Sequence, residues 1–227
     1  LVLFLGVRLA MSGSFTVGGG VTHFSITYAG TTSELSTDDQ VAGEPFNIQI
    51  RAMTTGDVVV TSYNGPVTIT SNAFSGPLPG THNLTNGVLT GIEVMPTIAG
   101  KDRIITVTDG AVTTNSAKFL VNPGPLDHFL VTMSGGTTPL SAVAKTAGTS
   151  FAVRVTAQDS SNNTIKDYTG TVDLTSGAFD GNVTATISAN GYVDTIAILP
   201  THSGTHQIGA NSIPYGGTVN DLDASGD

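Results

Sequence analysis

The sequence predicts an all-β protein: two tandem immunoglobulin-like β-sandwiches preceded by an extended N-terminal donor strand. Three observations support this prediction. Gly, Thr, Ser, Asn and Val dominate the chain, a composition that favours short strands and turns over helices. One structural unit occurs twice along the 227 residues. In the first 17 residues the odd positions except Gly13 carry large apolar side chains, and from residue 8 onward the even positions are small or polar, which is the pattern of a strand with one buried face.

The duplication is visible residue by residue. HFSIT at 23–27 matches HFLVT at 128–132, and YNGPVTITS at 63–71 matches YTGTVDLTS at 168–176, both at an offset of 105. One residue is then lost, and Asn86-Gly87 matches Asn190-Gly191 at an offset of 104. A match held over this length with a single gap indicates two copies of one fold.

Each copy contains runs with the period of two that is typical of strands. The expected strands of the first copy are FNIQIRAM (46–53), PVTITS (66–71), VLTGIEVMP (88–96), KDRIITVT (101–108) and AKFLV (117–121). Those of the second are FAVRVTAQ (151–158), TVDLTS (171–176), YVDTIAILP (192–200) and THQI (205–208). Turn pairs such as Asn86-Gly87 and Asp109-Gly110 separate them. Short strands at this spacing predict immunoglobulin-like domains at 21–123 and 125–215, joined stiffly through Pro123 and Pro125.

The segments LDHFLV (126–131), AGTSFAVRVTAQD (147–159) and DYTGTVDLTS (167–176) resemble the immunoglobulin-like repeats of bacterial and archaeal surface proteins. These invasin-like and filamin-like repeats occur in tandem in adhesins, S-layer proteins and filaments. The resemblance covers residues 21–123 and 126–213. It implies an extracellular or cell-surface location and a structural or adhesive role, with no catalytic residues to carry over.

The two copies differ at their ends. The first closes with a strand over 111–121, whereas no segment after Ile208 alternates like a strand, and the tail at 216–227 is acidic. We therefore expect the second domain to lack its last strand. Such a sandwich exposes a core groove and the unpaired backbone of an edge strand, and both are costly to leave open.

The N-terminal segment 1–17 is the expected replacement. Phe15 and Val17 lie 104 residues before Phe119 and Val121. The residues on the apolar face, which we expect to contact another copy, are Leu3, Leu5, Val7, Leu9, Met11, Phe15 and Val17. At the sites matching 7–13, the ordinary last strand carries Ala111, Thr113, Asn115 and Ala117. Insertion into a neighbour's second domain predicts a head-to-tail homopolymer, an extracellular filament or pilus. Its logic resembles that of chaperone–usher pili and archaeal donor-strand pili.

Other functions stay open. The N-terminal segment also fits a signal-peptide remnant, and residues 7–17 also fit the end of a preceding repeat in a longer array. The main alternative is a fragment of a surface adhesin or S-layer protein that binds a protein or glycan. A carbohydrate-active accessory domain is a third candidate, and it needs an aromatic platform that a chain without Trp and with 5 Tyr supports weakly.

Several classes are disfavoured. A net charge of −9 without a Lys/Arg cluster argues against nucleic acid as a partner. The absence of Cys removes thiol chemistry, and no G-x-S-x-G elbow is present, so we expect no enzyme and no cofactor. The N-terminal apolar run is short for a membrane span and contains a charge. We expect no metal site: Asp38, Asp39 and Asp159 are assigned to solvated turns, and His23 and His128 to packing or an inter-strand hydrogen bond. Candidate N-glycosylation sites are Asn83, Asn162 and Asn182.

Overall fold

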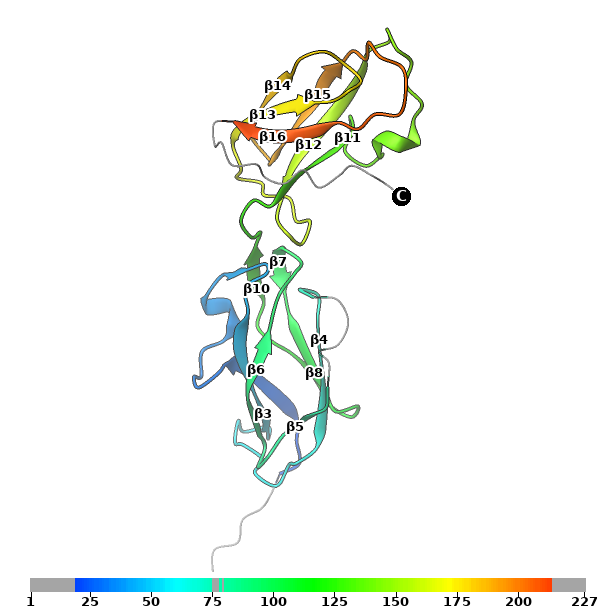
Figure 1. Cartoon of the computed structure of the whole chain (residues 1–227). Helices are drawn as coiled ribbons and strands as arrows, with labels where there is room; N and C mark the ends of the chain where they lie inside the picture. The colour runs from blue at the N-terminus through cyan, green and yellow to red at the C-terminus, as the bar shows by residue number, and fades with distance from the viewer. Residues whose placement is uncertain (1–18, 75–77, 79, 214–227) are drawn as a thin grey trace, which may run out of the picture.

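The computed structural model describes residues 19–74, 78 and 80–213. These residues form strands and turns with two short 3-10 helices, so the all-β prediction is confirmed. They build two units that stand end to end (Figure 1). The predicted donor strand at 1–17 and the acidic tail at 216–227 lie outside the described residues.

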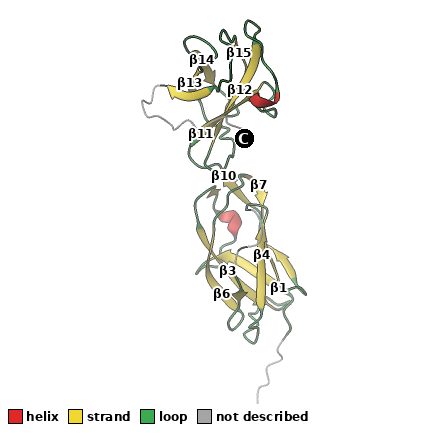
Figure 2. Ribbon diagram, turned by 45° about the vertical axis from the view of Figure 1, so that its right-hand side comes forward, coloured by secondary structure: helices red, strands yellow, loops and turns green. Residues whose placement is uncertain are grey.

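The described residues of the first unit form a sandwich of ten short strands. They are β1 (His23–Tyr28), β2 (Gln40–Val41), β3 (Phe46–Met53), β4 (Pro66–Ser71), β5 (His82–Asn83), β6 (Val88–Val94), β7 (Gly100–Arg103), β8 (Ile105–Thr108), β9 (Thr113–Asn115) and β10 (Phe119–Asn122), with the 3-10 helix η1 (Leu35–Thr37) between β1 and β2. The sheets have the orders β1-β3-β6, β5-β4-β8-β9 and β2-β10-β7. The last of these lies at the end nearest to the second unit (Figure 2).

The second unit repeats this plan with six strands among its described residues. They are β11 (His128–Met133), β12 (Phe151–Gln158), β13 (Gly170–Thr175), β14 (Val183–Ile187), β15 (Tyr192–Ile198) and β16 (Gly209–Ile213), with the 3-10 helix η2 (Leu140–Ala142) after β11. The sheets have the orders β11-β12-β15 and β14-β13-β16. The register is duplicated too, since His23 lies opposite Met53 and His128 opposite Gln158.

Alternation of side chains builds the two cores. In β3, Ile48 and Ile50 are completely buried, and their counterparts Val153 and Val155 in β12 are buried as well. Each unit has its own cluster of buried apolar residues. The turns behave as the sequence predicts: Asn86 and Gly87 both have positive φ, as do Asn190 and Gly191.

Three strand predictions need correction. KDRIITVT is not one strand: it divides into β7 and β8, which belong to different sheets, and Asp102 has a φ of 58°. The final strand of the first unit likewise divides into β9 and β10. The predicted strand THQI is a loop, and β16 follows it, pairing with β13 between Thr171 and Ile213. The alternation of β16 is hard to detect because its most buried positions carry only Gly209 and Ala210.

The joint between the units is fastened by two side chains of the second unit. The amide of Gly124 donates to Asp159 Oδ2 at 2.8 Å. Asn163 accepts from the amide of Ala99 and donates to the carbonyl of Thr97, both at 2.9 Å. Asp159 is 1% exposed, so its assignment to a solvated turn is wrong: its carboxylate is buried in the joint. We call this set of hydrogen bonds the polar clasp.

The clasp should weaken in acid. Burial alone would raise the pKa of Asp159, but hydrogen bonds from Asn163, Gly124 and Ser161 outweigh it and lower the pKa below its usual value. A lowered pKa means that Asp159 contributes its full stabilisation above about pH 5 and loses it as the pH falls through the folded-state pKa. The pH dependence of the denaturant midpoint of the second unit measures this loss.

The matched variant is Asp159→Asn, because the stability difference between it and the original protein separates the contribution of Asp159 from those of the other carboxylates. We expect that difference to be constant above about pH 5 and to shrink below about pH 4. A difference that stays constant down to about pH 2 would contradict the role given to the carboxylate.

Candidate strand-acceptor groove in the second unit

In the first unit, β10 covers one end of the core. Its inward side chains Phe119 and Val121 are 4% and 1% exposed. The ring of Phe119 meets that of Phe46 edge-on, with the centroids 6.1 Å apart. The backbone of β10 pairs with β7 on one side and with β2 on the other. Beneath it, Leu35 and Ala42 are 0% and 4% exposed.

In the second unit, the described residues 126–213 supply no strand at the place of β10. The counterparts of Leu35 and Ala42 are Leu140 and Ala147; Leu140 is only partly buried and Ala147 is exposed. The counterparts of the flanking strands, residues 145–146 and 204–207, are not strands. The same core edge that is covered in the first unit is therefore uncovered by the described part of the second.

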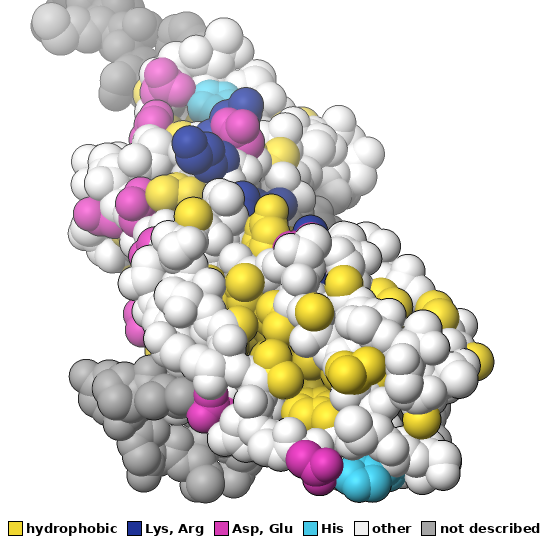
Figure 3. Space-filling view, turned by 90° about the horizontal axis from the view of Figure 1, so that it is seen from above, with side chains coloured by type: hydrophobic (Ala, Val, Ile, Leu, Met, Phe, Trp, Pro, Cys, Tyr) yellow, Lys and Arg dark blue, Asp and Glu magenta, His cyan; other side chains and the backbone are white. Residues whose placement is uncertain are grey.

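An open groove of about 640 Å³ occupies this place. Its lining is part apolar and part polar. The apolar part includes Leu140, Val143, Ala147, Phe151, Ala178 and Ile208, and the polar part includes Lys145, His202 and His206. Seen from the far end of the second unit, apolar side chains gather in the middle of the surface (Figure 3). The Lys145 ammonium sits 5.5 Å from the centre of the Phe151 ring and hydrogen-bonds the Leu140 carbonyl. Burial lowers the pKa of Lys145.

In the second unit, the position that corresponds to β9 is closed, whereas the position that corresponds to β10 is open. In the first unit β9 pairs with β8 and also contacts β1. In the second unit β16, the counterpart of β8, is paired on one side only among the described residues and contacts β11 directly. An added strand must therefore separate β11 from β16 there, whereas at the place of β10 the groove is already open.

In the last strand of the first unit, the side chains that point toward the core are not all the expected ones. Thr113 and Asn115, which were matched to the apolar face of the donor, are exposed, while Val112 packs against the core. The facing of alternate residues changes between β9 and β10 because the chain crosses from one sheet to another. The match to buried sites therefore holds for Phe119 and Val121, the counterparts of Phe15 and Val17. Leu3, Leu5, Val7, Leu9 and Met11, like Phe15 and Val17, lie outside the described residues, and their role stays a prediction.

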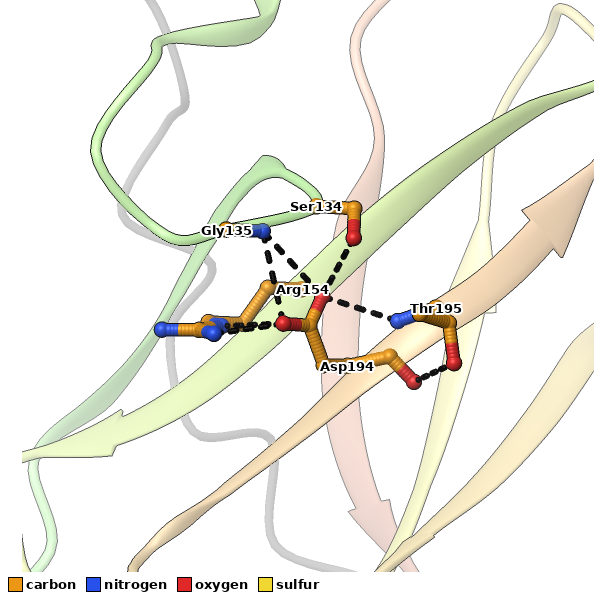
Figure 4. Close-up of polar contacts among 5 residues, drawn as sticks. All are labelled: Ser134, Gly135, Arg154, Asp194 and Thr195. Atoms are coloured by element: carbon orange, nitrogen blue, oxygen red, sulfur yellow. Dashed lines mark hydrogen bonds and ion pairs between the residues drawn. The ribbon is translucent and has the colours of Figure 1, made fainter.

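A separate polar cluster lies across β12 and β15 (Figure 4). Asp194 accepts hydrogen bonds from Arg154, from the hydroxyl of Ser134 at 2.8 Å and from the amides of Gly135 and Thr195. The Arg154 guanidinium, aided by the other donors, holds the pKa of Asp194 well below its usual range. Every oxygen of this carboxylate is engaged by the protein, so the cluster is structural. No motif in the sequence predicts this cluster.

This cluster holds Thr195 in an unusual conformation, with a φ of 59°. A β-branched residue with positive φ is strained, and the counterpart in the first unit is Gly91, with a φ of 69°. We expect Thr195→Gly to stabilise the second unit by about 1 kcal/mol. The reverse change Gly91→Thr is the matched control and should destabilise the first unit by a similar amount. Denaturant unfolding of each variant measures both effects, and a loss of stability in Thr195→Gly would contradict the strain.

The remaining sequence candidates are scattered. Asn83, Asn162 and Asn182 have exposed side chains on different parts of the surface, and Asn162 belongs to the turn of the joint. His128 contacts Gln158 of the neighbouring strand at 3.2 Å, an inter-strand hydrogen bond as expected. Within residues 19–213, apart from the undescribed gaps, no cluster of side chains fits a metal ion. In the same residues, no helix has the length and apolarity needed to cross a bilayer.

Comparisons with known proteins place the chain only loosely. No family model and no curated protein matches it. Among solved structures, domains 4 and 5 of the S-layer protein SbsC match with a TM-score of 0.27 and 17% identity, covering 86% of this chain and 94% of that one. The trypsin-activated alpha-2-macroglobulin of Escherichia coli matches with a TM-score of 0.30 and 13% identity over 89% of this chain. Beta-glucuronidase 3 of Bacteroides uniformis matches with a TM-score of 0.27 and 14% identity over 83% of this chain. The chain spans 15% of the macroglobulin and 23% of the glucuronidase.

Proposed function

We propose that the chain is a non-enzymatic structural subunit of an extracellular filament. In this proposal, the N-terminal strand of one copy enters the groove of the second unit of its neighbour, and repetition of this contact gives a head-to-tail polymer. The observation that carries the proposal is the uncovered core edge at Leu140, Ala147 and Phe151, at the place where β10 covers the first unit.

The chemistry of the groove favours residues 1–17 as its occupant. The positions that match Phe119 and Val121 carry Phe15 and Val17 in that segment. In residues 214–227, the positions at the same offset carry Asp223 and Ser225. Phe15 and Val17 can bury apolar surface against Phe151 in this groove, whereas the carboxylate of Asp223 would need the Lys145 ammonium as its partner. Residues 1–17 of another copy therefore match the apolar part of the groove better than residues 214–227 do.

The open and closed parts of the site suggest an order of insertion. Phe15 and Val17 meet the open groove first, beside Phe151. The preceding residues then pair with β16 as β11 and β16 separate. Backbone hydrogen bonds along the exposed edge of β16 supply part of the free energy, and burial of apolar side chains supplies the rest.

The test is assembly of the full chain compared with a variant lacking residues 1–17. We expect filaments in electron micrographs of the full chain and none in the truncated protein. A synthetic peptide of residues 1–17 should bind the truncated protein. The replacement Phe15→Asp in the peptide should weaken this binding by at least tenfold, because the ring that buries apolar surface against Phe151 is lost.

Two results would overturn the proposal. One is normal filament growth without residues 1–17. The other is a truncated protein that ignores the peptide until residues 214–227 are also removed, since the chain's own end would then occupy the groove. A stable monomer of the full chain that binds a protein or glycan would support the adhesin function instead.

A further inference from the structure

The joint inside the chain has two halves, and each half is repeated at a place where no other unit of the described residues covers it. One half is the turn at 159–163, which belongs to the second unit. The other is the loop at 97–99, which belongs to the first. The turn at 54–58 repeats the first half at the free end of the first unit. The loop at 201–203 repeats the second half at the far end of the second unit.

The backbones of the repeated surfaces agree closely. Thr54 donates to the carbonyl of Val58 at 2.9 Å, as Asp159 donates to that of Asn163 at 3.1 Å. The next-to-last residue of each turn has positive φ, 57° at Asp57 and 64° at Asn162. The loops match as well: Thr97 donates to the carbonyl of Ala73 at 2.8 Å, and Thr201 to that of Ala178 at 2.7 Å. Each free surface therefore has the shape that forms a joint elsewhere in the same chain.

The side chains of the turn differ at two positions that matter for the clasp. Thr54 replaces the buried Asp159, and Val58 replaces Asn163. Val58 is 64% exposed, the highest value among the exposed large apolar side chains of the described residues. Without a carboxylate and a carboxamide at these positions, the turn lacks the side chains that make the bonds to Gly124, Thr97 and Ala99. It presents an apolar side chain in their place.

The connecting residues differ in stiffness. Inside the chain the units are connected through Pro123-Gly124-Pro125, whereas residues 18–20 before the first unit are all Gly. Gly19 lies against Thr54, since a Cβ built on it would be 3.1 Å from a methyl group of Thr54. In the internal joint, Gly124 lies against Asp159 in the same way. Glycine runs are flexible, and proline restricts the chain.

We infer that the turn at 54–58 of one copy docks on the loop at 201–203 of the next, through Val58 and without a polar clasp. This inference rests on the proposed function, because a donor strand in the groove delivers Gly19 and the turn to that end of the neighbour. The filament then has two kinds of joint in alternation. The joint inside each chain is clasped and stiff. The joint between chains sets Val58 against the polar loop Thr201-His202-Ser203, lacks the hydrogen bonds of the clasp and is more compliant.

The test joins the two surfaces covalently. The chain contains no Cys, so the double variant Val58→Cys with Ser203→Cys has only the two introduced thiols, both at exposed positions. After assembly, a short bismaleimide should convert it into a ladder of covalent oligomers far beyond the dimer. Each single variant can give at most a dimer. The pair Ala99→Cys with Asn163→Cys, at the internal joint, should cross-link within one chain and calibrates the reach of the reagent.

The outcomes separate the inference from the proposed function. Filaments together with a ladder support both. Filaments without a ladder, when the internal pair does cross-link, overturn the contact through Val58 and leave donor-strand assembly standing. A full chain that forms neither filaments nor a ladder overturns both.

Discussion

Phe119→Ala should destabilise the first unit by about 3–5 kcal/mol. The side chain is 4% exposed and packs edge-on against Phe46, so its removal leaves a cavity under β10. With the shorter side chain, β10 also loses the apolar contact that holds it between β7 and β2. Hydrogen exchange or backbone amide signals followed during denaturant unfolding report each unit separately. A loss below about 1 kcal/mol would mean that β10 contributes little to this core.

The matched control is Phe151→Ala in the second unit, made in the protein without residues 1–17. Phe151 is the counterpart of Phe46 and lies in the wall of the open groove. Because no strand of the described residues covers it at the place of β10, we expect a smaller loss, of about 1–2 kcal/mol. A loss as large as that of Phe119→Ala would mean that another segment already covers the groove, which contradicts the proposed acceptor site.

Gly191→Ala should destabilise the second unit by about 3 kcal/mol or more. Gly191 has a φ of 70°, and a Cβ built on it would lie 2.1 Å from the carbonyl oxygen of Ile165. That oxygen belongs to the backbone and cannot move easily: the amide of Ile165 bonds to the carbonyl of Ala157, whose own amide bonds to the carbonyl of Gly191. The alanine is therefore both strained and obstructed.

Gly181→Ala separates these two effects. Gly181 has a similar φ of 74°, but a Cβ built on it meets nothing within 4 Å. It should show the conformational cost alone, about 1–2 kcal/mol. Equal losses in the two variants, measured by denaturant unfolding, would contradict the obstruction at Ile165.

Local patterns predicted much of the fold. FNIQIRAM matches the bounds of β3, and FAVRVTAQ those of β12, because their inward positions carry large apolar residues. The Asn-Gly turns were predictable from their tolerance of positive φ. The strand β16 was missed because Gly209 and Ala210 give no apolar signal. The division of 111–121 into two strands depends on which sheets are nearby, and a one-dimensional pattern does not contain this information.

The candidate groove was predicted because the second copy lacks a counterpart of the last strand of the first copy. The residues that line the groove could not be predicted. Leu140 and Ala147 line the groove because no described strand of the second unit covers them, whereas β10 covers their equivalents Leu35 and Ala42. That strand is distant in the sequence, so a local pattern does not reveal the difference. Asp159 was assigned to a solvated turn because its neighbours are polar. The structure buries it against Gly124 of the connection, a contact that becomes visible only when both units are placed together.

The path of β10 has a mechanical consequence. This strand is the last element of the first unit and continues directly into residues 123–125, so tension along the rod pulls on it lengthwise. The backbone hydrogen bonds that pair it with β2 and with β7 lie across that direction. Force is therefore shared among these bonds as shear and does not peel them one after another. The first unit should resist stretching until the whole strand slides at once.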